Sequence, residues 1–212
     1  MNAQDGAAAR VFLVDDQPAV LQALARLLKS AGHAVEAYGS ARAFLDSGNA
    51  AMPGCLVLDL SMPEMSGLAL QQELAGRASA LSLVFLTGHG DIDSGVRAMK
   101  LGAVDFLTKP VDDQRLLDAV EAALACNAQR LAQCSERDDL RQRLASLTPR
   151  EREVMALVAE GLLNKQVGDA LGMAEKTVKV HRARVMQKMN VRSVSALVRL
   201  VDRLGPQEPD AV

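Results

Sequence analysis

Aromatic residues are scarce in this sequence, which has no tryptophan, one tyrosine and four phenylalanines among 212 residues. Their scarcity excludes a core built on aromatic rings. Because 49% of the residues are hydrophobic, packed cores are still expected, made mainly of Leu, Val, Ala and Met. The length favours one medium-sized domain and one small domain.

Cysteine is also scarce. The three cysteines, Cys55, Cys126 and Cys134, are odd in number and show no CxxC spacing. This argues against a disulfide framework or a zinc site and favours reduced thiols. Cys126 and Cys134 lie two turns apart in a predicted helix, so a redox role for this pair stays an alternative.

Long apolar runs are absent. No run reaches the roughly 18 residues of a membrane-spanning helix, and residues 1–10 contain no apolar stretch of signal-peptide length. We therefore expect a soluble, cytoplasmic protein without a membrane partner.

The net charge of −2 conceals an uneven distribution. Residues 1–125 carry nine Lys/Arg against fifteen Asp/Glu, a net charge of −6. Residues 147–204 carry eleven Lys/Arg against six Asp/Glu, a net charge of +5. An acidic first half and a basic second half suggest different partners, and the basic half suits a polyanion.

The first half alternates short apolar runs with helical patterns. Continuous apolar runs are typical of parallel strands buried on both faces, and strands are expected at 11–14, 35–38, 56–58, 83–86 and 104–107. Helices are expected at 19–31, 41–47, 67–76, 94–101 and from 112 onward. The five βα repeats predict an α/β fold, a doubly wound five-stranded parallel sheet.

The second half is predicted to be helical. From about residue 112 a helical pattern continues without Gly or Pro to residue 147, and both a solvated connector and a short coiled coil fit its spacing. Thr148, Pro149 and Glu151 then form a capping-box pattern that begins a helix. Further helices are expected from a cap at Asn164, from 175 to 189 and from 193 to 204, which together predict a small all-α helix-turn-helix bundle.

Three acidic residues directly follow predicted strands. Asp15 and Asp16 come after the strand at 11–14, and Asp59 comes after the strand at 56–58. Because the carboxyl ends of parallel strands meet at one edge of a sheet, these charges would repel unless a cation is present, and Mg²⁺ is the expected ion. Lys109 and Thr87 are expected at the same edge.

This combination suits phosphoryl transfer to a carboxylate, with Asp59 as the nucleophile and Lys109 and the metal neutralising the phosphoryl oxygens. Each of these polar residues taken alone is more simply a strand end that faces water, but four charged residues and Thr87 together at successive strand ends favour a site. An alternative is a phosphatase of the haloacid-dehalogenase type. Such enzymes usually carry a second Asp two positions after the nucleophile, where this sequence has Ser61.

Four segments, covering roughly residues 10–125, resemble the receiver domain of two-component response regulators: VFLVDD at 11–16, LVLDLSMPEMSG at 56–67, TGHG at 87–90 and GAVDFLTKP at 102–110. The resemblance implies a flavodoxin-like receiver whose phosphoacceptor is Asp59. It implies that Mg²⁺ is bound by Asp16, Asp59 and the Ser61 carbonyl, with Asp15 acting through water.

The same resemblance implies that Lys109 pairs with the phosphoryl group and that its bond to Pro110 is cis, which a following proline makes accessible. Thr87 and Phe106 match the switch pair of the family. Many relatives carry Tyr at the position of Phe106, which has no hydroxyl group. The switch in this chain must therefore act through packing of the ring and not through a hydrogen bond from a hydroxyl group.

The predicted helix at 175–189 has two different faces. Val178, Val185 and Met189 should face the core, whereas Lys176, Val180, Ala183, Arg184 and Gln187 lie opposite, with Lys179 on the flank. A narrow apolar stripe and a cationic outer face suit a DNA major groove. An ordinary solvated surface is the simpler explanation for a charged helical face, but the local net positive charge favours DNA.

The segments LTPREREV at 147–154, NKQV at 164–167 and TVKVHRARVMQKM at 177–189 resemble the LuxR-type helix-turn-helix. With the HGDI loop at 89–92, the whole chain resembles the FixJ/StyR-like branch of the NarL/FixJ family. The resemblance implies base-edge contacts for Lys179 and Val180, and weaker ones for Arg184 and Gln187. It implies phosphate contacts for Asn164, Lys165, Thr177, His181 and Lys188. Ala174 stands where relatives often have a capping Ser.

The predicted domains are a flexible N-terminus (1–9), a receiver (10–125), a helical linker (126–146), a LuxR-type DNA-binding domain (147–205) and a disordered tail (206–212). The hypothesis is a phosphorylation-controlled transcriptional regulator. A sensor histidine kinase phosphorylates Asp59, which promotes homodimerisation and binding to double-stranded promoter DNA, with RNA polymerase as a further partner. No enzymatic activity is expected beyond Mg²⁺-dependent self-phosphorylation and dephosphorylation. A phosphorelay module whose bundle contacts only proteins is the second alternative.

Overall fold

The structure is a computed structural model that describes residues 10–88 and 92–202. The predicted flexible N-terminus, residues 89–91 of the HGDI loop and the predicted disordered tail lie outside the described residues. The chain divides into two compact units, with the boundary between Ala132 and Gln133.

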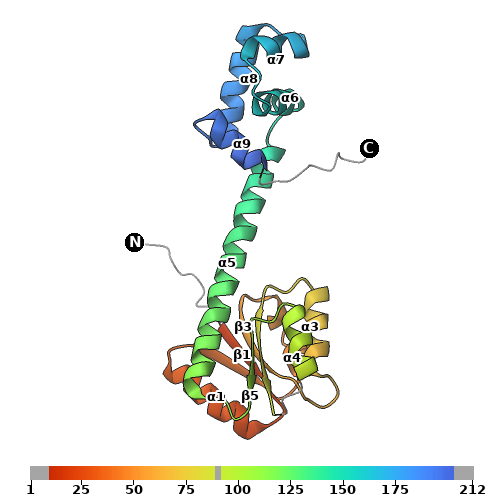
Figure 1. The fold of residues 1–212 in the computed structure, drawn as a ribbon, viewed down its shortest axis with the longest axis vertical. Helices are drawn as coiled ribbons and strands as arrows, with labels where there is room; N and C mark the ends of the chain where they lie inside the picture. Colours follow the sequence, from red (N-terminus) through yellow and green to blue (C-terminus); the bar gives the residue numbers. More distant parts are fainter. Residues whose placement is uncertain (1–9, 89–91, 203–212) are drawn as a thin grey trace. The chain divides into compact units, whose positions relative to one another are not determined.

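The first unit contains a five-stranded parallel sheet with the strand order β2-β1-β3-β4-β5, shown in Figure 1. The strands are β1 (Arg10–Val14), β2 (Ala34–Tyr38), β3 (Gly54–Asp59), β4 (Ser82–Thr87) and β5 (Asp105–Thr108). The helical elements are α1 (Pro18–Ser30), α2 (Ala41–Asp46), the short 3-10 helix η1 (Asn49–Ala51), α3 (Gly67–Gly76), α4 (Ile92–Lys100) and α5 (Asp113–Ala145). The predicted fold class is confirmed.

Both faces of this sheet are covered by helices. Successive residues of a strand point to opposite faces, so Phe12, Leu56 and Phe85 pack with α2, α3 and α4. Their neighbours Val11 and Val57 pack on the other face with α1 and the first turns of α5. Figure 1 shows α3 and α4 on one side of the sheet and α1 and α5 on the other. The continuously apolar strands are thereby explained.

Helix α5 is 33 residues long and contributes to both units. The heptad-spaced Leu117 and Leu124 pack against the core of the first unit, so packing against the sheet explains their spacing. Asn127 is buried and donates a hydrogen bond from Nδ2 to the Ala80 carbonyl oxygen at 2.5 Å. Contacts with the first unit therefore extend past the predicted receiver boundary at residue 125.

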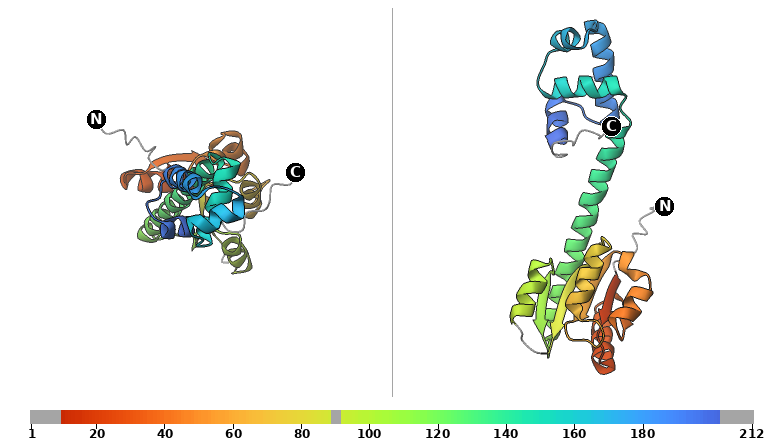
Figure 2. Two further views of the ribbon diagram at one scale, coloured as in Figure 1. Left: turned by 90° about the horizontal axis from the view of Figure 1, so that it is seen from above. Right: turned by 90° about the vertical axis from the view of Figure 1, so that its right-hand side faces the viewer.

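The second unit contains the helices α6 (Pro149–Ala159), α7 (Asn164–Leu171), α8 (Glu175–Lys188) and α9 (Val194–Asp202), and Figure 2 shows them from two further directions. Helix α8 packs against both α6 and α7. Its predicted inner residues Val178, Val185 and Met189 are buried in the core of this unit. Leu140 and Leu144, from the last turns of α5, lie in the same core, so the predicted linker contributes to it.

The helix starts differ in how they are capped. The Thr148 Oγ1 accepts a hydrogen bond from the Glu151 amide at 3.2 Å, and the Glu151 carboxylate accepts one from the Thr148 amide at 2.9 Å, as predicted. The prediction that Asn164 caps α7 was wrong by one residue, because Leu163 is the N-cap and Asn164 is the first helical residue. Ala174 precedes α8 without a side-chain cap.

Candidate functional site

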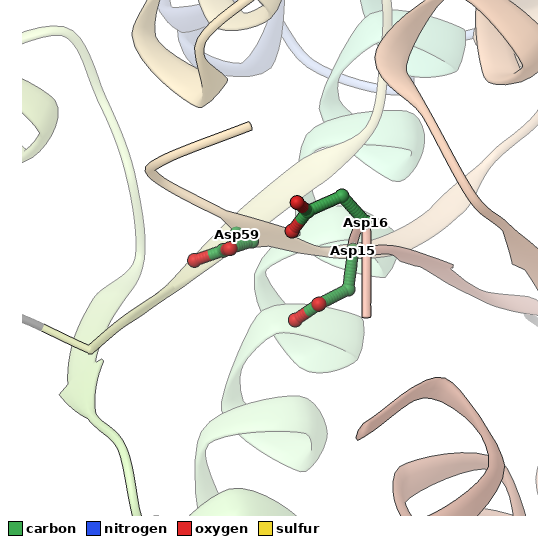
Figure 3. Close-up of side chains that lie close together, drawn as sticks. All are labelled: Asp15, Asp16 and Asp59. Carbon is green, nitrogen blue, oxygen red and sulfur yellow. The ribbon is translucent and has the colours of Figure 1, made fainter. Parts of the chain in front are cut away.

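The three acidic residues predicted to form a site are brought together at the carboxyl edge of the sheet. Strands β1 and β3 are parallel neighbours, and Val14 is paired with Leu58. Asp15 and Asp16, which follow β1, therefore lie beside Asp59, the last residue of β3. One carboxylate oxygen from each residue lies within 4.8 Å of the others, and Figure 3 shows the three side chains converging.

Lys109 supplies the positive charge at this edge. Its Nζ lies 2.5 Å from Asp15 Oδ2 and 3.3 Å from Asp59 Oδ2. Both carboxylate side chains are only 3% exposed, so their charges are poorly solvated. Burial raises the pKa of the Asp59 carboxyl group; the Lys109 charge opposes this shift and the Asp15 charge adds to it.

Two carboxylate oxygens in the cluster lack a protein partner. The Oδ1 atoms of Asp16 and Asp59 are buried and accept no hydrogen bond, whereas Asp15 Oδ1 accepts one from the Gln17 amide at 2.9 Å. Buried anionic oxygens without donors carry a desolvation cost that a hard divalent cation removes. The donor set fits Mg²⁺, which binds proteins through carboxylate oxygens, carbonyl oxygens and waters. Ser61, two residues after Asp59, lies exposed in the loop after β3.

Thr87 and Phe106, the predicted switch pair, lie on the adjacent strands β4 and β5. Thr87 is the last residue of β4 and is buried. The Phe106 ring is partly buried, and its centroid lies 6.5 Å from that of Phe85. A Cβ atom on Gly95 of α4 would lie 3.2–3.3 Å from three of the Phe106 ring atoms, so the ring packs directly on the backbone of α4. The Lys109–Pro110 bond is cis, as the resemblance implied.

The outer face of α8 is solvent-exposed, as predicted. Val180 is 46% exposed, and Lys179, Arg184 and Gln187 are exposed as well. Lys179 forms a surface ion pair with Glu175 at 3.0 Å. Exposed ion pairs of this kind contribute little stability, so the Lys179 ammonium can exchange this partner for another.

The residues predicted to contact DNA phosphates fall into two groups by burial. Lys165 and Thr177 are exposed, whereas Asn164, His181 and Lys188 are partly buried. Asn164 Oδ1 accepts a hydrogen bond from Arg182 at 2.9 Å. The Nδ1 atom of His181 is buried without a hydrogen-bond partner.

Lys188 is partly buried at the end of α8 and is bonded to two groups of the same unit. Its Nζ donates to the Ser146 carbonyl oxygen at 2.9 Å and to Glu151 Oε2 at 2.6 Å. Glu151 is buried, and the hydrogen bonds from Lys188 and from the Thr148 amide hold the pKa of its carboxyl group below the ordinary value. The capping pattern identified Glu151, but its pairing with a residue 37 positions away could not be inferred from local spacing.

Comparisons with known proteins agree with the two-unit division. Residues 11–121 match the response regulator receiver domain, and residues 145–201 match the luxR family of bacterial regulatory proteins. The transcriptional regulatory protein FixJ of Azorhizobium caulinodans is 45% identical over 200 residues, which cover 94% of this chain and 95% of FixJ. The chain belongs to the NarL/FixJ family of response regulators.

Two further proteins are similar to this response regulator. The response regulator protein TodT of Pseudomonas putida is 44% identical over 194 residues, covering 92% of this chain and 86% of TodT. The solved structure of response regulator StyR has a TM-score of 0.86 and 49% identity, and covers 93% of this chain and 100% of StyR.

The response regulator thus joins a receiver to a LuxR-type DNA-binding domain, and its relatives are transcriptional regulators of two-component systems. Membership of this family excludes the haloacid-dehalogenase alternative. The alternative in which the C-terminal bundle contacts only proteins is excluded as well, because that bundle matches the luxR family of DNA-binding regulatory proteins.

Within the described residues, none of the helices is both long and apolar enough to cross a membrane.

Proposed function

We propose that Asp59 is the phosphoacceptor of this response regulator and that its phosphorylation controls DNA binding by α8. The observation on which this proposal rests is the cluster of buried Asp15, buried Asp59 and adjacent Asp16, with Lys109 paired to the two buried carboxylates. The sensor histidine kinase is the physiological donor. A carboxylate oxygen of Asp59 attacks phosphorus, the bond to the donor breaks, and an acyl phosphate forms.

The acidic cluster is also the proposed magnesium site. Asp16, Asp59 and the Ser61 carbonyl oxygen would hold Mg²⁺, with Asp15 linked through water. When bound, the ion neutralises charge on the phosphoryl oxygens. Lys109 contributes a second positive charge, since its Nζ already lies within 3.3 Å of Asp59 Oδ2. Self-phosphorylation from small donors and self-dephosphorylation follow from the same groups.

Dimerisation is the proposed consequence of phosphorylation. The Thr87 hydroxyl group would turn toward the phosphoryl oxygens, and the Phe106 ring would move from the backbone of α4 into the vacated space. Movement of this ring changes the packing of α4. Val96 and Met99 on α4, and Leu101 directly after it, are apolar and 45–48% exposed. Exposed apolar side chains on α4, which packs against β5, support homodimerisation through the face formed by α4, β5 and α5.

DNA recognition is assigned to the exposed face of α8. Lys179 and Val180 would contact base edges, with Arg184 and Gln187 at the margin of the same face. Lys165, Thr177, His181 and Asn164 would contact phosphates. Two copies in a homodimer would bind a two-fold-symmetric promoter site, with RNA polymerase as a further partner.

The test of the phosphoacceptor is intact mass after incubation with Mg²⁺ and acetyl phosphate. The native chain should gain one phosphoryl group and Asp59→Asn should gain none. Asp46→Asn, which changes an exposed carboxylate of α2, should be phosphorylated like the native chain. Equal labelling of the native chain and Asp59→Asn would place the acceptor elsewhere.

Coupling to DNA needs a separate test. The phosphorylated native chain should bind a labelled duplex more tightly than the unphosphorylated chain, and Asp59→Ala should lose this response. Full DNA affinity in Asp59→Ala would disprove the coupling while leaving DNA binding itself intact.

A further inference from the structure

We infer that Arg182 positions Asn164 for a DNA phosphate, and that Arg182 acts through this amide without binding DNA itself. The inference rests on the proposed DNA binding by α8. It assigns a role to a residue that the resemblance to LuxR-type domains did not single out.

A hydrogen bond joins Arg182 to Asn164 across two packed helices. Arg182 lies on α8, and Asn164 is the first residue of α7, the helix packed against it. The Arg182 Nη1 atom donates to Asn164 Oδ1 at 2.9 Å in a partly buried hydrogen bond. Both side chains are shielded from full solvent exposure, which strengthens a charge-assisted hydrogen bond relative to one in open water.

This bond determines what the Asn164 amide can offer to a ligand. An asparagine side chain has one acceptor oxygen and one nitrogen with two donor hydrogens, and either end can face outward. Because Arg182 occupies the oxygen, the Nδ2 end is left for another partner. Nδ2 can only donate, and a DNA phosphate can only accept. The positive guanidinium also polarises the amide, so its N–H groups become better donors.

The start of α7 supports a phosphate as the partner. The N-cap Leu163 has no polar side chain, and the exposed Lys165 follows Asn164. The Gln166 Oε1 accepts a hydrogen bond from the Leu163 amide at 2.8 Å, which leaves its Nε2 end as a donor in the same way. Asn164, Lys165 and Gln166 therefore offer only donors at this helix start, and the helix N-terminus favours negative charge.

A double-mutant cycle separates this role from a direct contact. The probe is a fluorescein-labelled random-sequence duplex, and the affinity of the full-length, acetyl phosphate-treated chain is measured by anisotropy at several salt concentrations. Asn164→Ala and Arg182→Met should each lower affinity by about tenfold, as expected for a hydrogen bond to a charged group. The double variant should bind no more weakly than either single variant.

Salt dependence supplies a second readout. Each phosphate charge neutralised by a protein cation contributes about 0.9 to the slope of log affinity against log salt. Arg199→Met, which removes an exposed arginine from α9, controls for the loss of one distant charge. If Arg182 acts through Asn164, the slope for Arg182→Met should match that control, although its affinity is lower.

The outcomes are distinguishable. Multiplicative losses in the double variant, or a slope reduced by about one relative to Arg199→Met, would overturn the inference in favour of direct phosphate binding or general destabilisation. No binding by the native chain would overturn the proposed function and the inference together. In the DNA-free chain, the Asn164 Nδ2 resonances should shift in Arg182→Met, and unchanged resonances would contradict the hydrogen bond.

Discussion

Lys109 lies closer to Asp15 than to Asp59: its Nζ is 2.5 Å from Asp15 Oδ2 and 3.3 Å from Asp59 Oδ2. A single ammonium group thus faces two buried carboxylates, and Asp16 adds a third nearby. Asp59, the proposed phosphoacceptor, is therefore held in a site with more negative than positive charge. We therefore expect the folded receiver to respond to pH, to Mg²⁺ and to substitutions that neutralise one of these carboxylates.

Asp59→Asn should stabilise the receiver in magnesium-free buffer at neutral pH. Because burial raises the pKa of Asp59 in the folded state, the charged carboxylate opposes folding at any pH above that raised value. The free energy of unfolding should rise by about 1–3 kcal/mol, the usual cost of a buried polar group without a partner. Urea denaturation followed by circular dichroism measures the difference.

The sign of the pH dependence follows from the same shift. As pH falls below the ordinary aspartate range of about 4, Asp59 is protonated in both states and the advantage of Asp59→Asn should vanish. Mg²⁺ should stabilise the native chain but not Asp59→Asn. The exposed-carboxylate control Asp46→Asn should behave like the native chain, and equal stabilisation by Asp46→Asn would refute the local electrostatic explanation.

Acid should destabilise the DNA-binding unit through the pair of Glu151 and Lys188, whereas protonation of Asp59 relieves a cost in the receiver. The pKa of Glu151 is lowered by hydrogen bonds from Lys188 and Thr148. The charged carboxylate therefore stabilises the folded unit fully when the pH is above the ordinary pKa of 4.5. This stabilisation is lost as pH falls through the lower folded value. Glu151→Gln should therefore flatten the dependence of unfolding free energy on pH in this acidic range.

Lys188→Met tests the same cluster from its other side. Leaving buried Glu151 without its cation should lower the free energy of unfolding of the second unit by about 1–3 kcal/mol. Because the Lys188 Nζ is bonded to Glu151 and Ser146, we expect the salt slope of DNA binding to change little. A slope reduced by about one would instead support the phosphate contact expected from the family resemblance.

The parts of the site that sequence could predict depend on local order along the chain. Asp15, Asp16 and Asp59 follow apolar strands, and adjacent parallel strands end at one edge, so their convergence follows from the topology alone. The inner residues of α8 follow from helical periodicity in the same way. These regularities need no knowledge of how distant segments pack.

The remaining contacts join residues that are far apart in sequence. Asn127 bonds to Ala80 across 47 positions, and Lys188 bonds to Glu151 across 37. No periodicity relates such pairs, because tertiary packing alone decides which polar groups meet. The error at Asn164 is different: both Leu163 and Asn164 precede the α7 pattern, and the rule that Asn favours the cap selected the wrong one. The Arg182 bond occupies the Asn164 oxygen instead.

Truncation tests where the DNA-binding unit begins. A fragment of residues 147–212 lacks Leu140 and Leu144, which are buried in its core, whereas a fragment of residues 133–212 retains both. Burial of each leucine contributes about 1.5–3 kcal/mol. The shorter fragment should therefore unfold at a markedly lower denaturant concentration. Equal stability of the two fragments would show that the last turns of α5 are dispensable.

Leu163→Ser should stabilise the second unit by supplying the cap that α7 lacks. Leu163 is 70% exposed, so its replacement removes little core packing. Its backbone is extended, with φ −73° and ψ 154°, close to the φ −67° and ψ 158° of Ser66. The Ser66 hydroxyl oxygen accepts a hydrogen bond from the Ala69 amide, and a serine at 163 can accept from the Gln166 amide in the same way. The gain should be about 0.5–2 kcal/mol.

Two further variants control for this interpretation. Leu163→Ala removes the same exposed apolar surface without adding an acceptor, so its unfolding free energy should stay near that of the native chain. Ala174→Ser adds an acceptor before α8, but the Thr177 amide already donates to the Ala174 carbonyl oxygen at 2.9 Å, so its gain should be smaller. If Leu163→Ala stabilises as much as Leu163→Ser, loss of the exposed leucine, and not capping, is the cause.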